Sequence, residues 1–252
     1  MSLVLSPKSS IGLLGGTFDP PHIGHLLLAE CARREFGLDR VLFSPAGEPY
    51  RKTTPGDGTP PPRTVSASNH RLAMTELAVA GNPHFGVDAR EVHRAGNTYT
   101  IDTLESLRAE SGDAKPRLVL ILGSDALADM PYWKTPERLF ELASIVIARK
   151  GPLGPHEIAT EMPVPPTLLS LLRVRWPHRV GELLNHEHLP ETLPVVSTMP
   201  RLPISSTLIR QRVADGLPVQ YLVPASVETY IAAHGLYDRA GFDSNSQEAE
   251  HA

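Results

Sequence analysis

Two histidines follow a pair of glycines near the start of the chain, in the stretch Gly15-Gly16-Thr17-Phe18-Asp19-Pro20-Pro21-His22-Ile23-Gly24-His25. The stretch joins a short apolar run at residues 11–14 to a helix-like run that starts at residue 26. Glycines let the chain turn and approach a ligand closely, and a helix start offers N–H groups to an anion. For a lone histidine, the simpler interpretation is that it caps the helix or packs against the sheet. Two histidines three residues apart, on one helix face, instead predict contact with a phosphate that gains charge in a reaction.

A second polar group lies at residues 204–210, where Ile204, Ser205, Ser206 and Thr207 precede Leu208, Ile209 and Arg210. A hydroxyl residue before an apolar helical run is an N-cap signal, and capping alone is the simplest interpretation. Three hydroxyls in a row exceed what capping needs. Because helix side chains tilt toward the N-terminus, Arg210 is predicted to reach back over Ser206. Hydroxyls, N–H groups and a guanidinium together predict an anion site suited to a polyphosphate.

Three other positions carry weaker signals. The cluster Tyr50-Arg51-Lys52 precedes a proline-rich loop at residues 53–62, so it is either solvated surface or a phosphate clamp on a lid. Asp125 follows a strand-like run and either caps a helix or bonds ribose hydroxyls. Trp133 lies just beyond Pro131 in a loop, where a large aromatic ring must be buried or stack on a flat ligand.

Several function classes are excluded by what the sequence lacks. The histidines between residues 178 and 188 fit no compact zinc spacing, so no protein-held metal is predicted. There is no Gly-x-Ser-x-Gly elbow and no Gly-Lys-Ser/Thr phosphate loop, which argues against a Walker-type NTPase. The single cysteine, Cys31, excludes an intrachain disulfide.

Composition points to a globular cytoplasmic enzyme. A chain of 252 residues with 41% hydrophobic residues can build one large core. The net charge of −4 gives no general attraction to nucleic acid. No apolar run approaches the roughly 18 residues of a membrane span, and the first residues do not resemble a secretory signal. We therefore expect neither a nucleic-acid nor a membrane partner, while the oligomeric state is not readable.

Strand-like runs alternate with helix-like runs, which predicts a single α/β domain with a doubly wound, mostly parallel, Rossmann-like sheet over residues 1–238. The polar residues 239–252 are predicted to form a disordered tail. The predicted strands are residues 11–14, 41–43, 85–87, 118–122, 145–148 and 193–196, and the predicted helices are residues 26–36, 69–79, 101–110, 136–143, 208–214 and 225–233. The segment 151–192 could hold a further helix near residues 168–174, and the sequence assigns no role to this segment. Most of the polar stretches follow the carboxyl ends of strands, where ligands bind in such sheets.

In this combination the residues resemble the nucleotidyltransferase superfamily that carries an early (His/Thr)-x-Gly-His motif and a later Ser-Ser-Thr-x-x-Arg motif. Within it the chain is most similar to the bacterial nicotinate mononucleotide adenylyltransferases. The matching pieces are residues 15–25, 45–47 with Lys52, 70–74, 99–104, 123–127, Trp133, 204–210, 221–224, 230–231 and 236–237. Two departures stand out: Arg51 occupies a position where many relatives have histidine, and segments 53–62 and 151–192 look longer than usual.

The resemblance implies that ATP and nicotinate mononucleotide react to give deamido-NAD and pyrophosphate, with Mg²⁺ carried by the phosphates, in NAD biosynthesis. It implies direct in-line attack without a protein nucleophile, so catalysis would be positioning and charge stabilisation. The catalytic residues implied are His22, His25 and Arg210. The ATP site implied comprises Gly15, Gly16, Thr17, Phe18, Gly123, Asp125, Ile204, Ser205, Ser206 and Thr207. The mononucleotide site implied comprises Lys52, Thr100, Trp133 and Arg149.

Three alternatives stay open at this stage. A class I aminoacyl-tRNA synthetase fragment shares the His-Ile-Gly-His at residues 22–25, but it needs a Lys-Met-Ser-Lys-Ser-like loop and a tRNA-binding extension. A phosphopantetheine adenylyltransferase is disfavoured by Trp133 and by the greater length of this chain. A nucleotide sensor without turnover is disfavoured by the intact His22, His25 and Arg210. The choice between nicotinate and nicotinamide nucleotides is not decided by the sequence.

Overall fold

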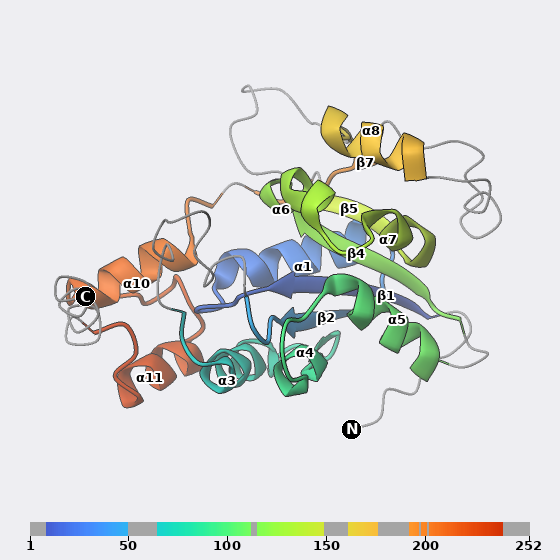
Figure 1. The fold of residues 1–252 in the computed structure, drawn as a ribbon. Coiled ribbons are helices and arrows are strands. Elements are labelled where there is room, and N and C mark those ends of the chain that lie inside the picture. Colours follow the sequence, from blue (N-terminus) through green and yellow to red (C-terminus); the bar gives the residue numbers. More distant parts are fainter. Residues whose placement is uncertain are drawn as a thin grey trace, which may run out of the picture. The chain divides into compact units, whose positions relative to one another are not determined.

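The main sheet of the computed structural model has five strands in the spatial order β3-β2-β1-β4-β5 (Figure 1). The structure describes residues 9–49, 65–111, 115–148, 161–175, 192–196, 198–200 and 202–238. The strands are β1 (Ser10–Gly16), β2 (Arg40–Pro45), β3 (Phe85–Val87), β4 (Arg117–Gly123) and β5 (Ser144–Ala148). β4 pairs in parallel with both β1 and β5. The predicted α/β fold is confirmed, and its first five predicted strands are present.

The helices also follow the sequence pattern. They are α1 (Ile23–Glu35), α3 (Ser68–Val79), α4 (Arg90–His93), α5 (Thr100–Glu110), α6 (Ser124–Asp129), the 3₁₀ turn η2 (Met130–Tyr132), α7 (Pro136–Leu142), α8 (Pro166–Arg175), α10 (Ser206–Ala214) and α11 (Ala225–Ala233). All six predicted helices are confirmed, and α8 fills the optional position. The sequence did not predict α4, α6 or η2, because elements this short show too little periodicity to recognise.

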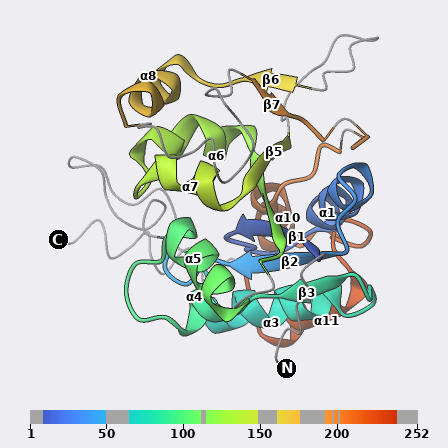
Figure 2. The same cartoon turned by 90° about the vertical axis from the view of Figure 1, so that its right-hand side faces the viewer.

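The sixth predicted strand, at residues 193–196, is wrong in its placement. Residues Thr192–Pro194 form β7, which pairs antiparallel with β6 (Glu161–Pro163) in a separate two-stranded sheet (Figure 2). Only an isolated bridge joins Val195 to Ile147 of β5. Proline has no N–H to donate to a ladder, so Pro194 cannot extend the pairing with β5 beyond this bridge.

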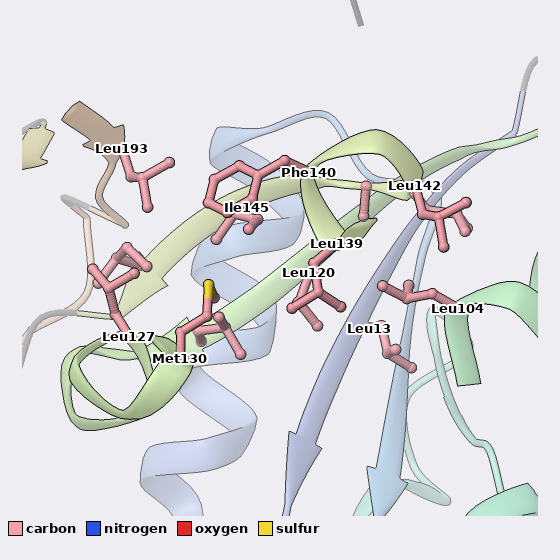
Figure 3. Close-up of a cluster of buried hydrophobic side chains, with 14 of the residues drawn as sticks. Leu13, Leu104, Leu120, Leu127, Met130, Leu139, Phe140, Leu142, Ile145 and Leu193 are labelled. Atoms are coloured by element: carbon pink, nitrogen blue, oxygen red, sulfur yellow. The ribbon is translucent and has the colours of Figure 1, made fainter. Parts of the chain in front are cut away.

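The chain separates into two compact units, each built from three segments. Unit 1 comprises Met1–Gly15, Leu28–Ser44 and Thr98–Met199, and unit 2 comprises Gly16–Leu27, Pro45–Asn97 and Pro200–Ala252. The core of unit 1 gathers Leu13 of β1 and Leu120 of β4 with Leu104 of α5 and Phe140 of α7 (Figure 3). The apolar run of β4 is buried here, as an inner parallel strand should be.

Unit 2 has a smaller apolar core. Met74 of α3, Ile209 of α10, and Val227 and Ile231 of α11 pack together in it. Helices α3 and α11 lie side by side in both views (Figures 1 and 2). Among the described residues, no helix is both long and apolar enough to cross a membrane.

Candidate functional site

The turn after β1 is shaped by Phe18, which lies in unit 2 with its side chain buried. Phe18 has a positive φ of 49°, a conformation that costs energy for a residue with a side chain. A Cβ on Gly16 would come within 2.9 Å of the Phe18 ring, so position 16 requires glycine. The sequence reasoning expected these glycines to allow a tight turn, and Gly16 does so by making room for an inward phenylalanine.

The two histidines meet at the start of α1, which begins at Ile23, three residues earlier than predicted. Their rings stack, with 3.7 Å between centroids and 25° between planes. The backbone N–H of His22 donates to Nδ1 of His25 at 3.2 Å. Because Nδ1 accepts this bond, the proton of a neutral His25 ring resides on Nε2. His25 can therefore present an N–H donor to a phosphate without being charged.

Close packing accompanies the stacked pair. A Cβ on Gly24 would lie 3.0 Å from the His22 ring, so glycine at position 24 lets that ring lie against the backbone. The N–H of Ile23 donates to the carbonyl of Leu222 at 3.0 Å. This helix-start N–H therefore fixes the turn to the C-terminal part of unit 2, whereas the sequence predicts that the N–H groups of this helix start bind an anion.

The three hydroxyl residues at the start of α10 play three different parts. Oγ of Ser205 accepts the N–H of Leu208 at 3.1 Å, which is ordinary N-capping. The hydroxyl of Ser206 donates to the carbonyl of Pro20 at 2.9 Å. Oγ1 of Thr207 accepts from Nη2 of Arg210 at 3.1 Å. Ser205 and Thr207 are exposed, and Ile204 just before them is half-buried.

Arg210 is buried and fixes the same turn. Its Nη1 donates to the carbonyl of Asp19 at 2.7 Å and lies 4.0 Å from Oδ2 of the same residue. The guanidinium therefore reaches Thr207 and Asp19, whereas the sequence predicts a position over Ser206. The two motifs at residues 15–25 and 204–210, far apart in sequence, are brought together by these bonds.

The carboxylate of Asp19 has a further partner that the sequence reasoning missed. The hydroxyl of Tyr237 donates to Oδ1 of Asp19 at 2.7 Å, and Asp19 is almost fully buried. Burial, together with the nearby Asp19 carboxylate, raises the pKa of Tyr237 well above its ordinary value. The pair Leu236-Tyr237 was part of the family resemblance, which is the signal that could have indicated a role.

Arg71 is the other residue without a predicted role. Its side chain, on α3, is only 1% exposed, although arginine is among the residues least often fully buried. Nε donates to the carbonyl of Ser66 at 2.9 Å, and Nη2 to that of Gly47 at 2.7 Å. Nη1 donates to the carbonyls of Thr17 at 3.0 Å and Ala46 at 2.5 Å. The sequence signal is its place within residues 70–74, one of the stretches that carry the family resemblance.

Unit 1 holds the predicted ribose contact. Gly15 is the penultimate residue of β1 and Gly123 the last of β4, and because these strands are parallel both residues lie at the same edge of the sheet. Asp125 lies in the first turn of α6 with its side chain exposed. The N-cap position of α6 is Gly123, so a side-chain cap by Asp125 is not what starts this helix. Its exposure is compatible with bonds to ribose hydroxyls.

The predicted ring contacts also lie in unit 1. Thr100 is the first residue of α5, and Trp133 follows η2; both side chains are half-buried. Trp133 packs on the unit 1 core with part of its surface. Beside it, Nζ of Lys134 lies 2.7 Å from Oδ1 of Asp102 and 5.0 Å from the centre of the Tyr99 ring. These contacts tie the start of α5 to the loop that carries Trp133.

Several predicted residues fall outside the described part of the chain: Tyr50, Arg51, Lys52 and Arg149, the proline-rich loop 53–62, the histidines between 178 and 188, and the tail 239–252. Within the described residues, no three or more His, Cys, Asp or Glu side chains are grouped so that they could hold a metal ion.

The fold and these motifs are those of a nucleotidyltransferase. Residues 13–212 match the model of the cytidylyltransferase-like family, and the chain belongs to this family.

Its relatives carry a more specific name. A protein from a Roseiflexus species is 43% identical over 231 residues, which cover 91% of this chain and 98% of that protein. One from Thermomicrobium roseum is 39% identical over 229 residues, covering 91% and 92%. Both are named probable nicotinate-nucleotide adenylyltransferases, so the family resemblance seen in the motifs is confirmed.

Solved structures support the fold. The nicotinic acid mononucleotide adenylyltransferase of Plasmodium falciparum, complexed with NaAD, superposes with a TM-score of 0.60 at 17% identity. The alignment covers 91% of this chain and 98% of that one. A Vibrio parahaemolyticus protein titled a putative nicotinate-nucleotide adenylyltransferase has a TM-score of 0.55 at 13% identity, covering 91% and 96%.

Proposed function

We propose that this protein transfers the adenylyl group of ATP to nicotinate mononucleotide, giving deamido-NAD and pyrophosphate in NAD biosynthesis. The observation that carries the proposal is the turn at residues 16–25. It presents stacked His22 and His25, and α10 holds it through Ser206 and Arg210. The names of the relatives supply the substrates.

The step we propose is a direct displacement. A phosphate oxygen of the mononucleotide attacks the α-phosphorus of ATP, a new P–O bond forms, and the bond from the α-phosphorus to the bridging oxygen breaks as pyrophosphate leaves. No protein nucleophile takes part. His25, with its proton on Nε2, donates to a phosphate oxygen on which negative charge grows, and His22 stacks against it. Such a donor helps most when it is already in place before the reaction.

The remaining residues are proposed to bind the two substrates. Gly15, Gly16, Thr17 and Phe18, with Ile204, Ser205, Ser206, Thr207 and Arg210, would receive the phosphates of ATP, and Gly123 and Asp125 its adenosine. Thr100 and Trp133 would hold the nicotinate ring, with Lys52 and Arg149 near phosphates. Arg210 would place its positive charge near these phosphates. It would also hold the turn in shape, because its guanidinium donates to the carbonyl of Asp19.

We propose that Mg²⁺ is carried by the substrate, because Mg²⁺ in phosphate-transfer sites is typically held by substrate phosphates and water with one or two carboxylates. When bound, the ion would neutralise phosphate charge. We also propose that the enzyme comprises one domain over residues 1–238 and works in the cytoplasm on these diffusible substrates, without nucleic acid or membrane.

The test is pyrophosphate release from ATP with nicotinate mononucleotide, nicotinamide mononucleotide or phosphopantetheine as the second substrate. We expect release with nicotinate mononucleotide to exceed release with the other two. Preferential release with phosphopantetheine would overturn the proposed substrate, and release with none of the three would overturn the proposed activity. A preference for the nicotinamide nucleotide would keep the reaction and change its specificity.

A further inference from the structure

The guanidinium of Arg71 holds several backbone segments of unit 2 at once. Its acceptors are the carbonyls of Thr17 in the turn after β1, of Ala46 and Gly47 in the loop after β2, and of Ser66 before α3. The first of these segments is part of the proposed phosphate site. A second bond joins it directly to the loop after β2, because the N–H of Ala46 donates to the carbonyl of Gly16 at 2.9 Å.

These bonds determine where the neighbouring N–H groups point. In a trans peptide the C=O and the following N–H lie in one plane and point in opposite directions. Among the described residues the cis peptide bond is Asp19–Pro20, and the peptides that follow Thr17, Ala46 and Gly47 are trans. Since these three carbonyls point at Arg71, the N–H groups of Phe18, Gly47 and Glu48 point away from it.

We propose that Arg71 is the positioning residue of the phosphate site: by drawing three carbonyls toward itself, it turns the N–H groups of Phe18, Gly47 and Glu48 toward phosphate oxygens of the substrates. The inference rests on the proposed function, because it assigns these N–H groups to that site. It adds a residue on α3 that does not itself touch the ligand. Gly47 and Glu48 supply two successive N–H groups, and successive N–H groups can form a concave anion-binding surface.

Arginine suits this task better than lysine. A planar guanidinium directs five N–H donors in fixed directions, so it can hold several carbonyls in one plane, whereas an ammonium is a compact point charge. Arg210 acts on the same turn from α10, through the carbonyl of Asp19. Two buried guanidinium groups therefore fix the turn at residues 17 and 19, on either side of the strained Phe18.

The experiment compares Arg71→Lys, which keeps the charge and loses the planar fork, with Arg71→Gln, which loses both. Calorimetry measures the Kd of pyrophosphate and, separately, of adenosine, which has no phosphate. Arg108→Lys is the matched control, because Arg108 is a partly buried arginine of unit 1 that also donates to two carbonyls, those of Pro116 at 2.6 Å and Leu142 at 2.7 Å.

We expect Arg71→Lys to weaken pyrophosphate binding about 10-fold and Arg71→Gln about 100-fold, the scale of one and two lost charge-assisted hydrogen bonds. Adenosine binding should be unchanged, and Arg108→Lys should alter neither Kd. Pyrophosphate binding at the wild-type level in both Arg71 variants would overturn the proposal. Equal weakening of pyrophosphate and adenosine would also overturn it, because that pattern indicates a general loss of structure.

A second measurement uses the wild-type chain and does not depend on the variants folding. In ¹H–¹⁵N spectra, we expect pyrophosphate to shift the amide signals of Phe18, Gly47 and Glu48, and adenosine to leave them in place. Unmoved amides with bound pyrophosphate would refute the role of Arg71. The proposed function is tested separately. If the protein binds pyrophosphate in this way but releases none from ATP and nicotinate mononucleotide, the role of Arg71 stands and the proposed activity is wrong.

Discussion

The two compact units differ in what they bury. Among the described residues, the buried aspartate, glutamate and arginine side chains all belong to unit 2, namely Asp19, Arg71, Asp88, Glu91 and Arg210. The buried polar residues described in unit 1 are serines and threonines only, namely Ser10, Ser44, Thr98, Thr103 and Ser111. Unit 1 is held by a large apolar core, and unit 2 combines a smaller one with buried charges.

This difference in buried charge indicates that the two units have different roles. A buried charge costs free energy unless it is paired and hydrogen-bonded, so it is a poor means of gaining stability. Asp19, Arg71 and Arg210 are each bonded to backbone or side-chain groups that shape the turn at residues 16–25. Unit 2 therefore uses costly buried charges to fix a candidate phosphate site, while unit 1 supplies an ordinary scaffold that carries the residues proposed to contact the ring and the ribose.

The largest effect is expected at His25, in unit 2. His25→Ala removes the Nε2 donor and should lower kcat by about 100-fold or more, the usual effect of deleting one preorganised donor. The thermal midpoint should change little. His84→Ala removes an exposed histidine of the same unit and should leave kcat unchanged. Near-normal turnover of His25→Ala would remove this residue from the reacting phosphates.

A substitution in the core of unit 1 should have the opposite pattern, a loss of stability with little change in kcat. Leu120 on β4 is fully buried, and Leu120→Ala should lower the free energy of unfolding by about 2–5 kcal/mol, because it leaves a cavity in an inner strand. Chemical denaturation measures this loss. At temperatures where the variant is folded, kcat should stay close to the wild-type value. Leu217→Ala, at a half-exposed leucine, should cost much less.

Trp133 tests whether unit 1 has a part in binding. Trp133→Ala should raise the KM for nicotinate mononucleotide about 10-fold, because base stacking on an aromatic ring is worth about 1–3 kcal/mol. The KM for ATP should stay the same. A raised KM for ATP with an unchanged KM for the mononucleotide would place Trp133 in the other pocket.

The smallest effect concerns Tyr237 and depends on pH. Tyr237→Phe removes the bond to Asp19 and should lower the free energy of unfolding by about 1 kcal/mol near neutral pH. The pKa of Tyr237 is raised by burial in the folded protein. Its contribution is therefore complete below the pKa of an unfolded tyrosine, about 10, and declines as the pH rises above that value.

Denaturation between pH 7 and pH 11 checks this expectation. The wild type should lose its advantage over Tyr237→Phe above about pH 10. Tyr132→Phe, at an exposed tyrosine, should behave like the wild type throughout. A constant difference between wild type and Tyr237→Phe across this range would show that the hydroxyl is not buried against Asp19.

Much of the fold was predictable because its signals are local. The apolar run of β4 and the helical periodicity of α3, α5 and α11 appear directly in the sequence. Pro194 shows the limit: residues 193–196 look like a strand, but a missing N–H limits their pairing with β5 to an isolated bridge. The predicted site residues in the described part of the chain lie on the expected turns and helix starts, and their roles stay predictions. Lys52 and Arg149 lie outside the described residues and stay predictions as well.

The sequence by itself determined the longer helices and the first five strands, the two motifs at residues 15–25 and 204–210, and the family they belong to. Only the tertiary structure decided what each polar group does there. Ser205 caps a helix, Ser206 bonds to the turn, and Arg210 reaches Asp19. Arg71 and Tyr237 acquire roles only in three dimensions. The physical reason is that a hydrogen bond depends on distance and direction between groups far apart in the chain, which residue type and spacing do not specify.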